Sequence, residues 1–454
     1  MLGRFRVRSG QRIFPASASI SFKSFFFGEE EVTAEKPALK KPRLEKPRPR
    51  ARQKSPAFPD PCKAPPPAAS FPQYEDREFF KFEIVHQSKK SSARVGRLHT
   101  PHGIIETPNY VAVATNAALK AVDHKSLNDV IQLMFCNTYH LLLHPGSEIV
   151  SEAGGLHRFM NRKSPIITDS GGFQVFSLAH GSVHDELNMK SRKKRDGSNN
   201  TNLLLSVTEE GATFRSYRDG TRILLTPETS VAAQKQLGAD IIIPLDELPP
   251  YHIEPERLVQ SVYLSHRWEA RSLQAHLENI KQQAMYAVIH GGVDYDLRRK
   301  SIEYLTSLPF DGFAIGGSLG KDREELIDLL RFVMPLMPKD KPNHLLGIAD
   351  IDSISLSVPL GVDTFDSCFP TRLGRHGTLL SRKHGRINIA RGKWKNVFEP
   401  PDPDYGLQDH TLSYLHHLHK AYEPLGATLT TLHNILFMSQ YMAEIRSKIL
   451  NDEI

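Results

Sequence analysis

One pattern recurs along the chain and restricts the folds that it can adopt. A short apolar run ends abruptly in glycine or a polar residue, and a stretch with helical spacing follows. Such runs are typical of strands that are buried on both faces in a parallel sheet. The pattern occurs in SPIITDSGGFQ, ADIIIPLDELPP, AMYAVIHGG, DGFAIGGSLG, NHLLGIAD and VDTFDSCFPTR. Serial strand–helix units imply a parallel sheet, either closed as a barrel or open and doubly wound.

The number of these units and the chain length favour the closed barrel. The 454 residues hold no glycine-rich dinucleotide fingerprint, so we expect an α/β fold, a (β/α)8 barrel with insertions. Between the runs, KDREELIDLLRFVMPLM places Leu326, Leu329, Leu330 and Val333 at helical spacing. Catalytic groups of such barrels sit at the carboxyl ends of the strands. The runs place the following residues there: Asp169, Asp246, His290, Gly316, Gly317 and Asp366.

The net charge of +7 belongs to the first part of the chain. Residues 1–70 carry 15 of the 58 Lys and Arg but only 6 of the 51 Asp and Glu, so the rest holds 43 basic and 45 acidic residues. A nucleic-acid site on this near-neutral body must therefore be a local patch.

The N-terminal extension has the composition of a disordered tail. Residues 1–28 hold five basic residues, several serines and no acid, which is typical of an organelle transit peptide and equally of an untargeted leader. Prolines and basic residues dominate 31–70, and the cluster at 40–54 also suits a nuclear address or a nonspecific RNA contact. We expect a disordered basic extension over 1–75 and a folded body over 76–454.

Cysteine usage and hydropathy indicate the compartment. Cys62, Cys136 and Cys368 are too far apart for a disulfide framework or a four-thiolate zinc site. No stretch approaches the ~18 uninterrupted apolar residues of a membrane helix. We expect a cytoplasmic protein with no membrane partner, or a mitochondrial or other organelle protein if the extension is a targeting signal.

Two of the strand-end acids suggest glycosyl chemistry. Asp169 and Asp366 come from distant strand ends, and two facing carboxylates can serve as nucleophile and proton carrier. An aspartate at a strand end can equally be a helix N-cap. Phe173 can stack on a base or fill the core, and Arg372 and Arg375, on a loop after Asp366, can contact phosphate or be ordinary surface residues.

Several ordered motifs resemble one enzyme family. DSGGFQVFSL, NTYHLLLHPG, PLDELPP, GGSLG, HLLGIAD, TFDSCFPTRLGR and YLHHLHKAYEPLGATLTTLHNI are similar to the tRNA-guanine transglycosylase family, the queuine tRNA-ribosyltransferases. The likeness covers roughly residues 80–445. It implies an irregular TIM barrel with a C-terminal helical subdomain over 398–454.

The resemblance also implies a reaction and its residues. The family replaces guanine at the tRNA wobble position with queuine or a related 7-deazaguanine through a covalent aspartyl-ribosyl intermediate, with Asp366 as nucleophile and Asp169 as general acid/base. The implied base-binding residues are Ser170, Phe173, Gln174, Asp246, His290, Gly316 and Gly317. The implied tRNA-binding residues are Gly347, Ile348, Ala349, Asp350, Thr371, Arg372 and Arg375. The alternative is a catalytically inactive, tRNA-binding subunit of a heterodimer; an active chain could form a homodimer or a heterodimer.

Two departures from the family pattern matter. The family's three zinc cysteines fall on Asp402, Asp404 and Leu407, and of the ligands only His433 matches, so we expect no zinc and no other cofactor. A substitute site of Asp402, Asp404, His410 and His433 is the alternative. His290 stands where the family usually has glutamine, and VIHGG beside GGSLG resembles a chlamydial-type subgroup.

Overall fold

The structure, a computed structural model, describes residues 63–127, 130–174, 177 and 203–454. The transit-peptide interpretation and most of the basic extension therefore lie outside the described residues. Within the described part of the chain, no helix combines the length and the apolar character needed to cross a membrane.

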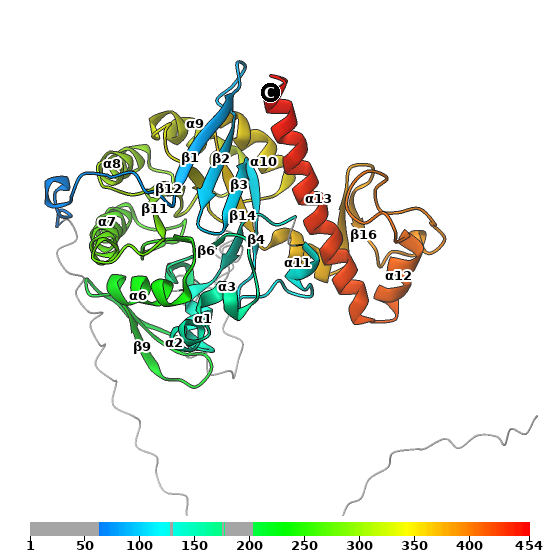
Figure 1. Ribbon diagram of the computed structural model, residues 1–454, viewed down its shortest axis with the longest axis horizontal. Helices are drawn as coiled ribbons and strands as arrows, with labels where there is room; N and C mark the ends of the chain where they lie inside the picture. The colour runs from blue at the N-terminus through cyan, green and yellow to red at the C-terminus, as the bar shows by residue number, and fades with distance from the viewer. Residues whose placement is uncertain (1–62, 128–129, 175–176, 178–202) are drawn as a thin grey trace, which may run out of the picture. The chain divides into compact units, whose positions relative to one another are not determined.

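Eight parallel strands close into a barrel (Figure 1). Around the barrel the order is β10, β11, β12, β13, β14, β4, β5, β6, so the expected (β/α)8 fold is confirmed. The strands are β4 (Asn109–Val113), β5 (Met134–Cys136), β6 (Ile166–Thr168), β10 (Ile241–Ile242), β11 (Ala284–Ile289), β12 (Gly312–Ile315), β13 (Asn343–Leu345) and β14 (Thr364–Ser367). The last six come from the six apolar runs named above, whereas β4 and β5 come from segments outside those runs.

Helices surround the barrel. They connect successive parallel strands and bury their apolar faces against the outside of the barrel. They are α1 (Thr138–Leu143), α2 (Ser147–Glu152), α3 (Gly155–Phe159), α6 (Pro227–Leu237), α7 (Pro255–Leu277), α8 (Tyr295–Thr306), α9 (Arg323–Val333), α10 (Ile351–Ser357) and α11 (Phe369–Arg375). Helix α9 buries Leu326, Leu329, Leu330 and Val333 as its spacing predicted, and its first turn is capped by the Asp322 side chain.

Two three-stranded antiparallel sheets are added to the barrel. One comprises β1 (Lys81–Gln87), β2 (Arg94–Thr100) and β3 (Gly103–Thr107), and the other β7 (Leu204–Val207), β8 (Ala212–Arg215) and β9 (Arg222–Leu225). Leu98 and Ile105 of the first sheet share a buried cluster with Val111, Ile167 and Ile241 of the barrel strands. The first sheet therefore covers one end of the barrel.

The C-terminal part has its own small core. β15 (Thr378–Ser381), β16 (Gly385–Asn388) and α12 (Leu412–Lys420) enclose a cluster that includes Leu379, Ile387, Trp394 and Leu415. The long helix α13 (Pro424–Leu450) lies between this subdomain and the barrel (Figure 1) and contributes to the core of both.

Residues 63–75, assigned above to the extension, have a defined path along the barrel. The Arg267 guanidinium donates to the Lys63 carbonyl at 2.6 Å, and the Tyr304 hydroxyl donates to the Pro66 carbonyl at 2.8 Å. The Lys341 ammonium lies 3.4 Å from the centre of the Tyr74 ring. Phe71 and Tyr74 supply the packing surface of this segment.

Candidate active site

The expected acids do gather at the carboxyl ends of the barrel strands. Asp169 follows β6 and accepts hydrogen bonds from the Thr138 backbone N–H at 2.7 Å and from the Asn137 amide. Burial, with a smaller contribution from the charges of Asp246 and Asp366, raises the pKa of Asp169 to about 7, against the lowering effect of the Thr138 and Gly171 backbone hydrogen bonds. A carboxyl group with this pKa can give or take a proton near neutral pH.

Asp366 is held by one of its two oxygens. Its Oδ1 accepts from the Gly347 backbone N–H at 2.8 Å and lies 3.1 Å from Nε2 of His344. No described residue donates a hydrogen bond to Oδ2. His344, which lies on the neighbouring strand β13, is fixed in turn by its Nδ1 contact with Thr364 Oγ1 at 2.9 Å.

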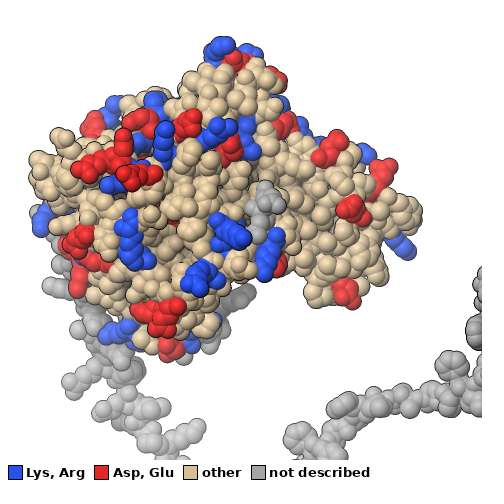
Figure 2. Space-filling view, in the orientation of Figure 1, with Lys and Arg blue, Asp and Glu red and all other residues tan. Residues whose placement is uncertain are grey.

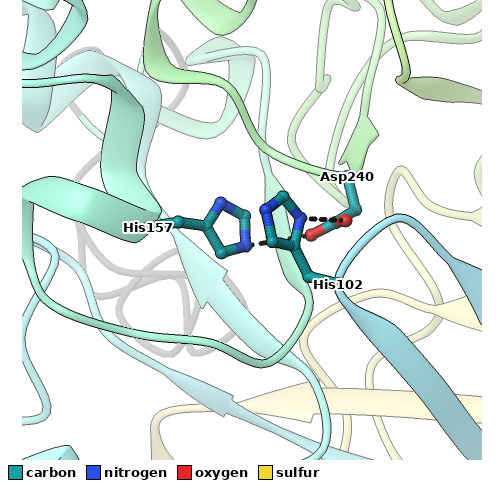
Figure 3. A group of neighbouring side chains, drawn as sticks. All are labelled: His102, His157 and Asp240. Atoms are coloured by element: carbon teal, nitrogen blue, oxygen red, sulfur yellow. Dashed lines mark hydrogen bonds and ion pairs between the residues drawn. The ribbon is translucent and has the colours of Figure 1, made fainter.

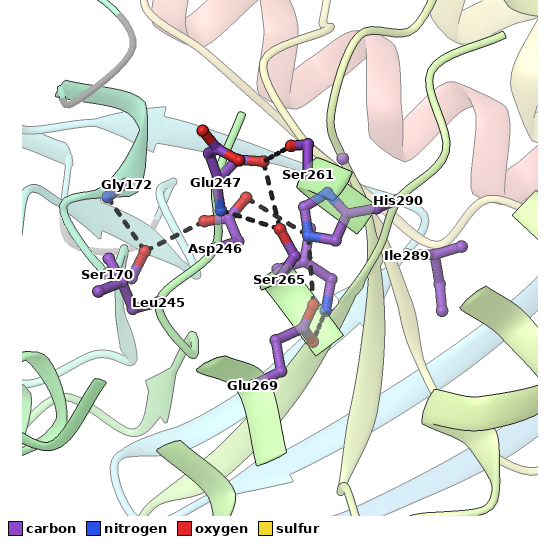
Figure 4. Close-up of polar contacts among 12 residues, drawn as sticks. Ser170, Gly172, Leu245, Asp246, Glu247, Ser261, Ser265, Glu269, Ile289 and His290 are labelled. Atoms are coloured by element: carbon purple, nitrogen blue, oxygen red, sulfur yellow. Dashed lines mark hydrogen bonds and ion pairs between the residues drawn. The ribbon is translucent and has the colours of Figure 1, made fainter. Parts of the chain in front are cut away.

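Asp246 lies beside the glycines of DSGGFQ. Ser170 Oγ donates to Asp246 Oδ1 at 3.4 Å and accepts from the Gly172 N–H at 3.2 Å (Figure 4). A Cβ on Gly172 would lie 2.6 Å from Asp246 Oδ1, so this glycine is required for the close approach of the aspartate itself. Burial raises the pKa of Asp246 to about 7.

His290 and Glu269 form a second buried contact behind Asp246. His290 Nε2 lies 3.2 Å from Glu269 Oε1 and 3.5 Å from Asp246 Oδ2, and Figure 4 shows the three side chains converging. Glu269 comes from the middle of α7 and was not predicted as a site residue. Ser261, Ser265, Glu269 and Ser272 recur at helical spacing, but such a polar stripe normally predicts a face turned to water. Here the stripe is buried, and Ser265, Glu269 and Ser272 accept backbone N–H groups of the strand ends.

One arginine fixes the turns after β11 and β12. Arg298 is fully buried, and its guanidinium donates to four backbone carbonyls at 2.6–2.9 Å, those of Ile289, Gly292, Gly316 and Ser318. Gly317 lies in this turn with φ +75°, a conformation that favours glycine, and its N–H donates to no described group. That N–H is therefore free for a ligand carbonyl, as the resemblance implies.

Phe173 and Gln174 occupy different environments. The Phe173 side chain is 47% exposed, which contradicts the alternative that it fills the core. Gln174 is buried, and its Oε1 has no hydrogen-bond partner among the described residues.

The residues expected to contact tRNA are only partly open to a ligand. Ala349 is buried in the main core, and Asp350 caps α10 and pairs with Arg323 at 3.0 Å; Ile348 is half-buried. Thr371 is buried, and its Oγ1 accepts from Arg375 at 3.3 Å.

Arg372 and Arg375 lie in helix α11, not on the loop that we expected, because Pro370 at the first turn suits a helix start. Arg372 is exposed and Arg375 is half-buried. Basic and acidic side chains share the face drawn in Figure 2, in keeping with the near-neutral body.

The positions of the family's zinc ligands do not fit a zinc ion. His433 Nδ1 accepts from the Leu407 N–H at 3.1 Å, and its Nε2 contacts the Leu380 carbonyl at 2.7 Å. Asp402 Oδ2 accepts from Ser381 Oγ at 3.1 Å and from the Arg382 N–H at 2.5 Å. Both ring nitrogens are committed to the backbone and Leu407 offers no ligand, so the absence of zinc stays a prediction with a physical basis.

The described residues bring one group of three metal-ligating side chains together elsewhere, at the amino end of the barrel (Figure 3). His102 Nδ1 and His157 Nε2 lie 2.7 and 3.2 Å from the two oxygens of Asp240. The imidazole rings stack at 3.5 Å with an interplanar angle of 11°. An ion must lie near the plane of each ring that binds it, so two parallel rings cannot both bind one ion. The two imidazoles instead contact the two oxygens of the Asp240 carboxylate.

Known proteins resemble this chain over nearly all of its folded body. The family model for Queuine tRNA-ribosyltransferase matches residues 88–454. A queuine tRNA-ribosyltransferase of Protochlamydia amoebophila is 57% identical over 380 residues, covering 83% of this chain and 97% of the relative. Those of Chlamydia caviae and Chlamydia felis are 51% and 50% identical over 379 residues, 82% of this chain and 99% of each relative. The resemblance and its chlamydial character are thus confirmed, and the chain belongs to the queuine tRNA-ribosyltransferase family of pentosyltransferases.

Proposed function

We propose that this chain replaces guanine at the wobble position of tRNA with queuine or a related 7-deazaguanine, through a covalent ribosyl intermediate on Asp366. The observation that carries the proposal is the unequal use of the two Asp366 oxygens. Oδ1 is held by His344 and Gly347, whereas Oδ2 is bonded to no described residue. A carboxylate that is anchored in this way can present its second oxygen to an anomeric carbon at low entropic cost.

The exchange would run as two displacements on one carbon. Asp366 Oδ2 attacks ribose C1′, the C1′–N9 bond breaks, and the leaving guanine takes up a proton from Asp169. The incoming base then gives its N9 proton to Asp169, N9 attacks C1′, and the bond to Asp366 breaks. Two inversions retain the configuration, as in retaining glycosidases. The pKa of Asp169, raised to about 7 mainly by burial, suits both proton transfers.

The base would be read by groups around this pair. Asp246 can accept the N–H donors on one edge of guanine, and the free Gly317 N–H can donate to its carbonyl. The exposed ring of Phe173 can stack on the purine once it is unstacked from the anticodon loop. Arg372 and Arg375 on α11, close in sequence to Asp366, would contact the neighbouring tRNA phosphates.

The test is guanine exchange. The full chain is incubated with unmodified tRNA that carries a guanine wobble base and with radiolabelled guanine. We expect incorporation by the wild type, none by Asp366→Ala, and wild-type incorporation by the control Asp328→Asn, which changes an exposed acid on α9. A folded wild type that binds tRNA but incorporates no guanine would contradict the proposal and indicate an inactive partner subunit.

A further inference from the structure

Helix α11 depends on its neighbours for its shape and position. It holds seven residues, Phe369–Arg375, and an isolated helix of this length is not stable in water. It begins just after Asp366 in the sequence and carries Arg372 and Arg375. Whatever fixes α11 therefore also fixes these two arginines relative to the aspartate.

The backbone of α13 lies directly against α11 (Figure 1). A Cβ on Gly374 would lie 2.6 Å from the Cα of Thr431 and 2.8 Å from the carbonyl oxygen of Thr430, so only glycine allows this approach. The Thr430 hydroxyl donates to the Gly374 carbonyl at 2.6 Å. Because Gly374 lies between the two arginines in the sequence, a change in the spacing of the two helices would move both arginines.

One buried amide on α13 joins α11 to strand β15. Asn434 is 0% exposed. Its Nδ2 donates to the carbonyls of Pro370 and Thr378, both at 2.9 Å, and its Oδ1 accepts from the Leu380 N–H at 2.8 Å. All three partners are backbone groups, so both amide hydrogens are used and the orientation of the amide is fixed. A shift of either segment would leave buried polar groups unpaired, so this amide specifies one arrangement of α11 on α13.

We propose that Asn434 is a positioning residue for tRNA binding, which holds α11 so that Arg372 and Arg375 meet the tRNA phosphates while Asp366 meets the ribose. This inference rests on the proposed function and adds to it a residue of the C-terminal helix, outside the barrel. No described acid forms an ion pair with either arginine, so the placement of their guanidinium groups depends on the helix that carries them.

Two variants displace α11 in different ways. Asn434→Leu keeps about the same volume but makes none of the three hydrogen bonds. We expect the Kd for tRNA, measured by filter binding, to rise about tenfold, while the KM for guanine at saturating tRNA stays within about twofold of wild type. Gly374→Ala leaves Asn434 in place but pushes α11 away from α13, and it should raise the Kd in the same way. It provides the test if Asn434→Leu does not fold.

A matched control separates this effect from a general loss of stability. Gln283 is a buried amide at the amino end of the barrel, and its Nε2 donates to the carbonyls of Gln234 and Ala239 at 3.2 and 2.7 Å. Gln283→Leu should lower the melting temperature as Asn434→Leu does, because both remove hydrogen bonds from buried backbone groups. The Kd for tRNA should be unchanged in Gln283→Leu.

A double-mutant cycle tests whether Asn434 acts through the arginines. In Arg372→Ala/Arg375→Ala protein the tRNA contacts of α11 are already lost. Adding Asn434→Leu to that protein should therefore change the Kd for tRNA by less than about twofold. A further tenfold rise would overturn the inference, because Asn434 would then affect tRNA binding by another route.

Hydrogen–deuterium exchange gives a readout that needs no tRNA. Amides of residues 369–375 should exchange about tenfold faster in Asn434→Leu than in wild type, and at the wild-type rate in Gln283→Leu. Unchanged exchange in Asn434→Leu, or an equal rise of the Kd in Asn434→Leu and Gln283→Leu, would also overturn the inference. If the wild type binds tRNA but exchanges no guanine, the proposed chemistry fails, and the binding measurements still decide the role of Asn434.

Discussion

The two ends of the barrel use the same residue type in opposite ways. At the amino end, three aspartates each accept a backbone N–H of the neighbouring strand at 2.8–2.9 Å and contact a cationic or imidazole side chain. These are Asp240, Asp311 and Asp363. At the carboxyl end, Oδ2 of Asp366 is bonded to no described residue, and burial raises the pKa of Asp169 and Asp246 to about 7. The amino end therefore stabilises the closed barrel, whereas the carboxyl end retains the capacity to bind and react.

The largest effect should come from the carboxyl end. Asp366→Asn keeps the shape but removes the nucleophile, so we expect exchange to fall by about 10⁴-fold or more. The melting temperature should stay within a few degrees of wild type, because no described Lys or Arg forms an ion pair with Asp366. Radiolabelled guanine incorporation and a thermal melt test both statements. A large loss of stability would mean that Asp366 also stabilises the barrel, as the aspartates of the amino end do.

A substitution at the amino end should have the opposite outcome, with stability lost and exchange activity kept. Asp363 is fully buried and pairs with Arg94 at 2.7 Å. Asp363→Ala leaves that arginine buried without its partner and should cost about 3–5 kcal/mol of unfolding free energy. Exchange per folded molecule should be unchanged. Denaturant titration measures this loss of unfolding free energy. The double variant Asp363→Ala/Arg94→Met should recover part of it, because no unpaired charge is then buried. Equal losses in the single and double variants would show that an unpaired Arg94 is not the cause.

An intermediate effect should follow from the group that anchors the nucleophile. His344→Phe removes the contact to Asp366 Oδ1 while keeping an aromatic ring in the barrel. A hydrogen bond to a charged group contributes about 1.5–3 kcal/mol, so kcat should fall about 10- to 100-fold with little change in the KM for guanine. Steady-state kinetics test this, and a change confined to KM would assign His344 to base binding instead.

The contributions of Asp169 and Asp240 to stability should respond to pH with opposite sign. The folded pKa of Asp169 is raised to about 7 from its unfolded value of about 3.9, so its contribution is present below pH ~4 and is lost as the pH rises through 7. Burial raises the pKa of Asp240, but hydrogen bonds with His102 and His157 outweigh it, and the net pKa is lower than usual. Its contribution is present above pH ~4 and is lost as the pH falls further.

The matched variants for this pH comparison are Asp169→Asn and Asp240→Asn. We expect the first to flatten the decline in melting temperature between pH 4 and 7, and the second to flatten the decline toward acid. Melting curves measured from acid pH, below pH ~4, up to pH 7 that change in the same way for both variants would refute the opposite signs.

The smallest effect should come from metal removal. Both ring nitrogens of His433 are bonded to the backbone, so dialysis against a chelator should change neither exchange nor the melting temperature. Metal analysis after dialysis provides the check. Zinc at one ion per chain, lost together with stability, would show that the subdomain does hold a metal.

Much of this contrast between the two ends of the barrel could be predicted from the sequence, because the order of residues shows which end of each strand an acid occupies. Asp169 follows an apolar run, whereas Asp240 and Asp311 precede one, and that order alone assigns each acid to an end of the barrel. Strands β4 and β5 were not among the six predicted runs, although β13, which was predicted, also opens with a polar residue and has three residues.

Glu269, Arg298 and His344 were missed for a different reason. Each is a polar residue in a helix or strand, and only the packing of distant elements shows that it is buried against the site. Periodicity identifies a polar face but not whether that face meets water.

Arg298 limits how the carboxyl end of the barrel could be altered in evolution or by design. Barrel loops are commonly exchanged as separate modules on a constant scaffold. Here one guanidinium bonds to carbonyls from the segments after both β11 and β12, so the two segments share a single support. A grafted segment must present its carbonyls to this arginine, and a graft that replaces α8 would leave the carbonyls after β12 without their donor. A new specificity is therefore best transferred as both segments together with the helix that carries the arginine.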